Sequence, residues 1–209
     1  MEAPDAAISR SFAIAKWLAI ELNELPVTAS LRNRLAGACL SITQDHHCAI
    51  ILLLQHGLNA SAFALARLQF ESYVRGIWLA QRATDVQVQQ YSMGGEPPSM
   101  DRMLESLEKL EAYSGGTLSE VKAKSWSNMC SLTHTGSMQA NRWLTVDAIE
   151  QNYPAEEVAG LARYSACFAL LSGVGMATLA NNDELGLRIM AKSSVFQNDG
   201  SGQQEPSRA

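Results

Sequence analysis

Long segments with helical apolar periodicity, separated by short breaks, constrain the fold of this 209-residue chain more than any other feature. The segments cover residues 5–24, 28–56, 59–83, 99–113, 117–142 and 154–180, with shorter ones at 84–92 and 184–192. Residues that favour helix starts and stops lie between them, including Ser30, Gly57 and Gly116. No segment of useful length alternates as a β-strand does. The pattern therefore predicts a single-domain all-α bundle of about six to seven helices.

The C-terminal residues have a different composition from the rest of the chain. From Ser193 onward the sequence is polar and rich in Gly, Ser and Gln. Such a segment has too few apolar side chains to offset the entropy lost on ordering. We therefore expect a helical bundle domain over residues 1–192 and a flexible, disordered tail over residues 193–209.

Composition excludes several classes of protein. The chain is 47% hydrophobic and 18% charged, with a formal net charge of −5, which rules out a disordered chain and a basic nucleic-acid-coating protein. Its four cysteines have no spacing suited to a disulfide framework or a zinc site. We interpret them as reduced, buried thiols, which favours a cytoplasmic location.

Two apolar stretches, Ala49–Leu68 and Ala166–Ala180, raise the question of a membrane span. The first contains three polar side chains and the second is about fifteen residues long, so neither reaches the roughly 18–20 uninterrupted apolar residues that a span needs. The acidic, polar N-terminus lacks the pattern of a signal peptide. We expect buried core helices and no membrane partner.

The segment 59–83 is apolar on two sides, which predicts a central helix of the bundle. Arg67, Glu71 and Arg75 follow one another at four-residue intervals and form a narrow stripe between the apolar sides. Two interpretations stay open. The stripe is either a solvated row of two ion pairs, or a half-buried network in which Glu71 orients both guanidinium groups toward an anionic ligand.

The segment 117–142 contains a run without charge, from Ser125 to Asn141, that is rich in Ser, Thr, Asn and Met. Ser127, Ser131 and His134 share one face there. Small hydroxyl side chains allow helices to approach closely, so we expect His134 at an interface within the bundle. It is either a hydrogen-bonded structural residue or a general acid/base.

The remaining sequence patterns do not indicate a metal site or a nucleotide-binding site. No Glu-x-x-His or His-x3-His pair supports a metal site, and no glycine-rich phosphate loop is present, so we expect neither a metal nor a cofactor. Gly173 and Gly175 lie in an apolar helical run, where tight helix packing explains them.

The stretch ARLQFESYVRGIWLA, followed some sixty residues later by SLTHTG, resembles a group of uncharacterised bacterial all-helical proteins with an R-x3-E helix and a later S-x2-H helix. That group is distantly similar to the HEPN superfamily, whose helical bundles often dimerise and include ribonucleases of toxin and phage-defence systems. On this resemblance Arg67, Glu71, Ser131 and His134 are the matching positions. HEPN ribonucleases carry an Arg four to six residues before a His, whereas the nearest basic residue before His134 is Lys124.

Two functional hypotheses follow. The first is a cytoplasmic, homodimeric binding or interaction module of a bacterial stress or phage-defence system, with Arg75, Ser131 and Lys124 as candidate ligand-binding residues for RNA or another anion. The second is a metal-independent ribonuclease in which His134 is the acid/base, Arg67 and Arg75 bind phosphate and Glu71 positions both arginines. The two differ in whether His134 is accessible to solvent beside a cationic side chain.

Overall fold

A computed structural model describes residues 2–200, with side chains described for residues 2–196. Over these residues the chain is helical with no strand, as the all-α prediction requires. The elements are α1 (Pro4–Glu21), α2 (Leu31–Gln55), α3 (Asn59–Gln81), α4 (Asp85–Ser92), α5 (Met100–Leu107), the 3-10 turn η1 (Glu111–Tyr113), α6 (Thr117–Thr133), α7 (Ser137–Asn141), α8 (Ala155–Leu179) and α9 (Asp183–Gly200).

Several helix ends lie where the sequence signals predict them. The Ser30 hydroxyl accepts a hydrogen bond from the backbone N–H of Asn33 and caps α2. Thr84 and Gln87 form a reciprocal capping box at the start of α4. Gly57 follows α2 with a φ of +69°, a backbone conformation that glycine adopts without steric cost. Local side-chain chemistry thus accounts for these boundaries.

The described residues form nine α-helices, more than the six to seven expected, chiefly because the predicted helix 117–142 is divided. It ends at Thr133, and Thr135 adopts a φ of +52° before α7 begins at Ser137. Gly136 packs so closely on this turn that an added Cβ would lie 2.6 Å from the Ser131 hydroxyl oxygen. Helix α9 also extends to Gly200, beyond the expected end at Lys192, while residues 201–209 of the predicted tail lie outside the described residues.

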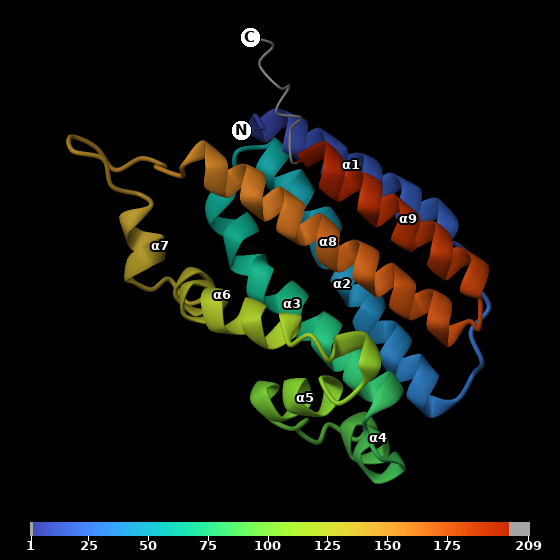
Figure 1. Ribbon diagram of the computed structural model, residues 1–209. Coiled ribbons are helices and arrows are strands. Elements are labelled where there is room, and N and C mark those ends of the chain that lie inside the picture. Colours follow the sequence, from blue (N-terminus) through green and yellow to red (C-terminus); the bar gives the residue numbers. More distant parts are fainter. Residues whose placement is uncertain (1, 201–209) are drawn as a thin grey trace.

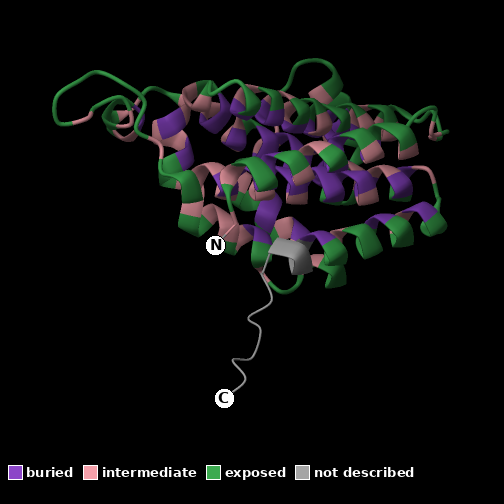
Figure 2. Ribbon diagram, turned by 90° about the horizontal axis from the view of Figure 1, so that it is seen from above, coloured by how far each residue is buried: buried purple, intermediate pink, exposed green. Residues whose placement is uncertain are grey.

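Helices α3 and α8 occupy the middle of the molecule (Figure 1). Helix α8 packs against α1, α2, α3 and α9, whereas α3 packs against α2, α5, α6 and α8. Buried residues accordingly gather where the helices face one another (Figure 2). The prediction that α3 is central is confirmed, and its remaining partly exposed side faces α6.

The closest helix packing occurs where α2, α3 and α8 meet. Leu40 of α2 is fully buried and inserts between Gly76 of α3 and Gly175 of α8. A Cβ on Gly76 would lie 2.9 Å from Leu40 Cγ, and one on Gly175 would lie 3.0 Å from Leu40 Cδ1. Both distances are below normal contact, so only glycine allows the three helices to approach this closely. Gly175 therefore allows tight helix packing, as its place in an apolar helical run predicts.

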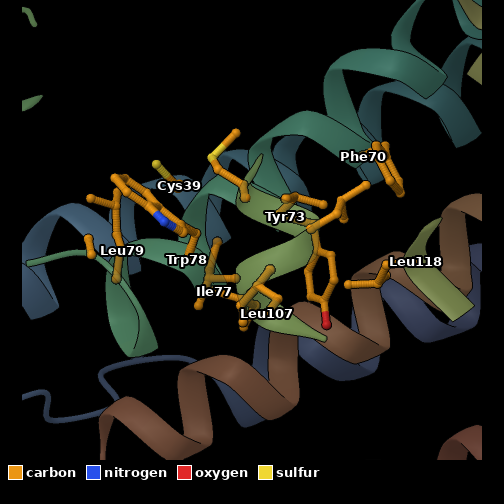
Figure 3. Close-up of a cluster of buried hydrophobic side chains, with 14 of the residues drawn as sticks. Cys39, Phe70, Tyr73, Ile77, Trp78, Leu79, Leu107 and Leu118 are labelled. Carbon is orange, nitrogen blue, oxygen red and sulfur yellow. The ribbon is translucent and has the colours of Figure 1, made fainter. Parts of the chain in front are cut away.

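A largely aromatic and aliphatic core extends from this contact toward α5 and α6 (Figure 3). Phe70 and Tyr73 of α3 both stack edge-on against Phe168 of α8, with ring centroids 5.5 and 5.3 Å apart. Leu107 of α5 and Leu118 of α6 are buried in the same cluster. This core fixes α6 beside α3.

A polar network runs through the centre of the bundle and was not anticipated. His47 of α2 is fully buried, and its Nδ1 accepts a hydrogen bond from the Ser165 hydroxyl at 2.8 Å. Its Nε2 donates to the carbonyl oxygen of Ser11 at 3.2 Å. The Gln69 amide donates to the Ser165 carbonyl oxygen at 2.9 Å, which adds α3 to the network. Burial disfavours the charged imidazolium and lowers the pKa of His47 to about 4, although the hydrogen bond to the Ser11 carbonyl oxygen acts in the opposite direction.

Two helices, α2 and α8, are long and apolar enough to cross a membrane, judged by length and composition alone. These helices overlap only in part with the stretches Ala49–Leu68 and Ala166–Ala180, so the expectation of no membrane partner stays a prediction. The most apolar window of α8 is 67% buried inside the bundle, and that of α2 is 39% buried. Core helices of globular proteins pass the same test, so the criterion is weak evidence for a membrane span.

The expectation that all four cysteines are buried is confirmed only for Cys39. All four are free thiols, with Cys39 buried, Cys130 and Cys167 half-buried, and Cys48 exposed. Cys48 directly follows the buried His47, and one residue corresponds to about 100° of rotation around a helix. It therefore points away from the bundle.

We predict that stability declines as pH falls from about 6.5 to about 4. In that range the unfolded chain binds a proton at His47, whereas the folded chain does not, because its pKa is lowered to about 4. The loss should reach about 3 kcal/mol, the free energy of a pKa difference of roughly 2.5 units. Urea unfolding at a series of pH values measures it.

The substitution His47→Gln removes the group with the large shift and should make this pH dependence shallower, even if the variant is less stable at neutral pH. The part that remains includes His46, whose pKa burial also lowers. Replacing the exposed His56, which makes no side-chain hydrogen bond among the described residues, should leave the dependence unchanged and is the control. An equally steep loss in His47→Gln would contradict the assignment.

Candidate functional site

The site begins with the partly exposed stripe of α3. Arg67 Nε donates to Glu71 Oε1 at 2.7 Å, and Arg75 Nη2 donates to Glu71 Oε2 at 3.3 Å. The side chains of Arg67, Glu71 and Arg75 retain 22%, 15% and 30% of their exposure. The stripe is thus a half-buried network rather than a solvated row, which decides between the two interpretations of its geometry.

Three side chains on successive turns of α6 meet the guanidinium of Arg67. Its Cζ lies 4.6 Å from the ring centroid of Trp126, close enough for a cation–π interaction. Its Nη1 donates to Cys130 Sγ at 3.4 Å and to His134 Nε2 at 3.0 Å. Because these residues are spaced by four along α6, they form one line facing α3. Arg67 therefore connects Glu71 on its own helix to three residues of the neighbouring one.

His134 lies at the C-terminal end of α6 and is exposed. His134 does contact α3, through Arg67, as expected of a residue at a helix interface, but it stays exposed because α6 ends there instead of continuing to Arg142. Since a guanidinium can only donate, Nε2 accepts in the hydrogen bond with Arg67, and the neutral ring carries its proton on Nδ1. An accessible imidazole beside a cationic side chain is the arrangement that an acid/base role requires.

An open cavity of about 500 Å³ adjoins the stripe. Its walls combine charged, aromatic and loop residues from α3, α4, α5, α6 and the loop that joins α4 to α5. They are Arg67, Glu71, Arg75, Tyr91, Gly94, Gly95, Glu96, Pro97, Pro98, Ser99, Met100, Met103 and Trp126. A cavity of this size accommodates a small molecule.

Arg75 has hydrogen-bonding capacity left over. Its Nε is buried and has no partner within the described part of the chain, and one Nη2 hydrogen bond to Glu71 leaves further donors at the cavity. Burial raises the pKa of the Cys39 thiol and that of the Tyr91 hydroxyl. The positive charge of the nearby Arg75 offsets part of each shift. The Nη groups of Arg75 therefore keep donors available for an acceptor in the cavity.

The charges at the cavity do not all have the same sign. Arg67 and Arg75 bring two positive charges, and the shared Glu71 neutralises one of them. Glu96 brings a second carboxylate from the loop, where it is exposed to water and therefore screened. The inner wall thus carries a net positive charge, and the opposing charge lies at the rim.

Two of the candidate ligand-binding residues lie away from the cavity. The Ser131 hydroxyl accepts the backbone N–H of Met138 at 3.1 Å and so stabilises the turn between α6 and α7. Lys124 is 73% exposed and pairs with Glu120 on its own helix. The structure therefore brings Arg67, Glu71, Arg75 and His134 together and leaves Ser131 and Lys124 outside.

Sequence reasoning missed Trp126, Cys130 and the loop 93–99. The first two share the spacing of His134, at eight and four residues before it, so the same helical face contains all three. That periodicity was a usable signal. The loop gave no such signal, because only the tertiary structure brings it opposite Arg75.

A family profile, described as a family of unknown function (DUF6988), matches residues 40–199, which include every residue of the site named above. The chain belongs to the DUF6988 family. Comparison with curated proteins and with solved structures finds no match. For this DUF6988 protein the match supports the resemblance to an uncharacterised family.

We predict that Glu71→Gln destabilises this DUF6988 protein by about 1–3 kcal/mol, because the amide oxygen cannot satisfy both half-buried guanidinium groups. The matched control is Glu105→Gln, which breaks another i,i+4 pair, with Lys109, whose side chains are 72% and 61% exposed. That change should cost no more than about 0.5 kcal/mol. Urea unfolding followed by circular dichroism compares the two, and equal losses would show that the Arg67–Glu71–Arg75 network is not specially stabilising.

Proposed function

We propose that this protein binds a small anionic ligand, such as a phosphate-bearing molecule, in the cavity between α3, α6 and the loop 93–99. The observation that carries the proposal is the cavity that Arg67 and Arg75 line, where the Arg75 guanidinium makes a single hydrogen bond, to Glu71, among the described residues. Guanidinium groups match the oxygen geometry of phosphate and carboxylate. Glu71 holds both arginines in position before a ligand arrives, which lowers the entropic cost of binding.

The wider setting of the proposal comes from the resemblance described above. In this proposal the protein is a cytoplasmic, homodimeric binding module of a bacterial stress or phage-defence system. It needs no metal, no cofactor and no membrane. The distant similarity to HEPN bundles supports the system and the dimer. Four free cysteines without a disulfide support the compartment.

Inorganic phosphate and pyrophosphate are the probes for the proposed site, and isothermal titration calorimetry measures their binding. Arg75→Gln should weaken binding at least about tenfold, since a charge-assisted hydrogen bond contributes roughly 1.5–3 kcal/mol. Glu96→Gln removes the carboxylate at the rim and should strengthen binding. Lys124→Gln is the control and should bind as the unaltered protein does, because Lys124 lies outside the cavity.

Circular dichroism establishes that each of these variants is folded. Binding that is lost equally in Arg75→Gln and Lys124→Gln would indicate diffuse charge attraction and would overturn the proposed cavity. Absence of binding of either anion by the unaltered protein would overturn the anion site itself.

A metal-independent ribonuclease is the second candidate function, and the exposed His134 next to Arg67 favours it. In this scheme the 2′-hydroxyl of RNA attacks the adjacent phosphorus, His134 takes the hydroxyl proton, and the 5′-oxygen leaves with a proton from water. Arg67 and Arg75 stabilise the charge on the phosphoryl oxygens. Since Arg67 occupies the Nε2 lone pair, His134 acts as a base at that atom only after the phosphate has drawn Arg67 away.

Incubation with mixed RNA in the presence of EDTA tests this second function. The unaltered protein should cleave RNA to products with 2′,3′-cyclic phosphate ends, and His134→Ala should reduce the rate at least about a hundredfold, the size of a typical acid/base contribution. Equal inactivity of the two proteins would retire the ribonuclease and leave the binding function unaffected.

A further inference from the structure

The loop between α7 and α8 forms a hairpin that extends away from the bundle (Figures 1 and 2). We define the hairpin as residues 143–149. Leu144 and Ile149 form an antiparallel bridge, and the Thr145 N–H donates to the Ala148 carbonyl oxygen at 3.0 Å. The hairpin is therefore an ordered element rather than a loose connection, although it packs on no core cluster of the described residues.

The hairpin exposes an unusual amount of apolar surface. Val146 is 99% exposed and Ile149 82% exposed, with Leu144 at 51% and Trp143 at 39%. Single exposed apolar residues are common on protein surfaces, but four on one short projecting element form a patch of the kind that marks an interaction site. Its sequence, WLTVDAI, carries one charged side chain, Asp147.

An apolar groove opens beside the base of the same hairpin. It has a volume of about 460 Å³ and lies between α3, α6, α7 and the N-terminal half of α8. Phe63, Met129, Leu132, Met138 and Leu161 supply most of its apolar lining. Arg142 and Glu157 form an ion pair at its edge, where the hairpin leaves the bundle. One chain thus carries both an unoccupied apolar groove and an unpartnered apolar projection.

We propose that two copies of this protein associate by reciprocal exchange, with the hairpin of each chain seated in the apolar groove of the other. The exchange is self-complementary, so it closes as a two-fold dimer instead of growing into a filament. The proposal names a surface and a partner that are separate from the anion site, because the groove and that cavity share no lining residue.

The two hairpins supply about half of the area that a stable dimer needs. The exposed portions of the four hairpin side chains amount to roughly 300 Å² of apolar surface, given the area that burying such side chains removes from water. The exchange occurs twice, so the hairpin side chains alone bury about 600 Å². Specific interfaces begin at about 1,200 Å² in total, and the groove surface and the hairpin backbone of both copies must contribute the rest.

An intramolecular alternative, in which the hairpin folds back into the groove of its own chain, is opposed by local hydrogen bonds. The Asn152 N–H donates to the Arg142 carbonyl oxygen at 2.7 Å, and the Glu150 N–H donates to the Trp143 carbonyl oxygen at 3.0 Å. Together with the Arg142–Glu157 ion pair, these bonds hold the base of the hairpin straight and directed outward.

Sedimentation velocity at micromolar concentration tests the dimer. The unaltered protein should have twice the 22.7 kDa mass of one chain, and the double variant Val146→Asp/Ile149→Asp should have the mass of one chain. The control, Ile20→Asp/Val86→Asp, places two charges at sites that are 75% and 67% exposed on α1 and α4, and should remain dimeric. Gly160→Trp fills the groove from a position where an added Cβ meets nothing within 4 Å, so it should also give single chains.

Disulfide trapping tests the exchange itself. Val146→Cys and Gly160→Cys are prepared separately in a Cys48→Ser background, which removes the exposed native thiol. Mixing the two proteins under mild oxidation should produce a covalent heterodimer, and neither protein alone should do so.

The proposal is overturned by any of four results. In sedimentation, these are a single-chain mass for the unaltered protein or a dimer that survives Val146→Asp/Ile149→Asp. In trapping, it is a disulfide that forms between two Val146→Cys chains. The fourth is a single chain whose hairpin binds phospholipid vesicles. Phosphate binding by the single-chain variants is measured in parallel, so failure of the dimer and failure of the anion site are distinguished.

Discussion

The contact of Leu40 with two glycines is the constraint on which the arrangement of the bundle depends. Gly76 and Gly175 allow α3 and α8 to approach α2 on opposite sides of one leucine side chain. Any larger residue at either position would force the helices apart or displace Leu40. With α2 and α8 this close, α3 is covered on two sides, and α6 covers most of the remainder. The stripe that contains Arg67, Glu71 and Arg75 is what stays partly accessible.

The charged side chains of the stripe are paired because this packing leaves them little contact with water. A helix surrounded by others has little room for charged side chains unless they are paired. Glu71 pairs with both arginines, and Arg67 also finds partners in Trp126, Cys130 and His134. Arg75 makes only the hydrogen bond to Glu71 among the described residues, and its side chain lines the cavity. Donors that stay available at a cavity wall are a physical basis for ligand binding, which fully paired ions do not give.

Two kinds of polar interior coexist in this protein and have different consequences. In the network around His47, both ring nitrogens have partners inside the bundle and the imidazole is sealed from water. The network around Arg67 is open, because His134 is exposed and a cavity adjoins the guanidinium. The first therefore couples stability to pH, whereas the second is available for chemistry or binding. The sequence predicted that His134 lies at a helix interface, but it did not predict the burial of His47.

Local patterns in the sequence determined the helical class, several helix ends and the membership of one stripe, because side-chain spacing and capping act over four residues or fewer. They also predicted that Arg67 and His134 belong to elements with unusual polarity. The separation between those elements, the end of α6 at Thr133 and the cavity against the loop 93–99 depended on contacts between residues far apart in the chain. Such contacts arise from how glycines, aromatic rings and a shared carboxylate pack in three dimensions, and no local periodicity encodes them.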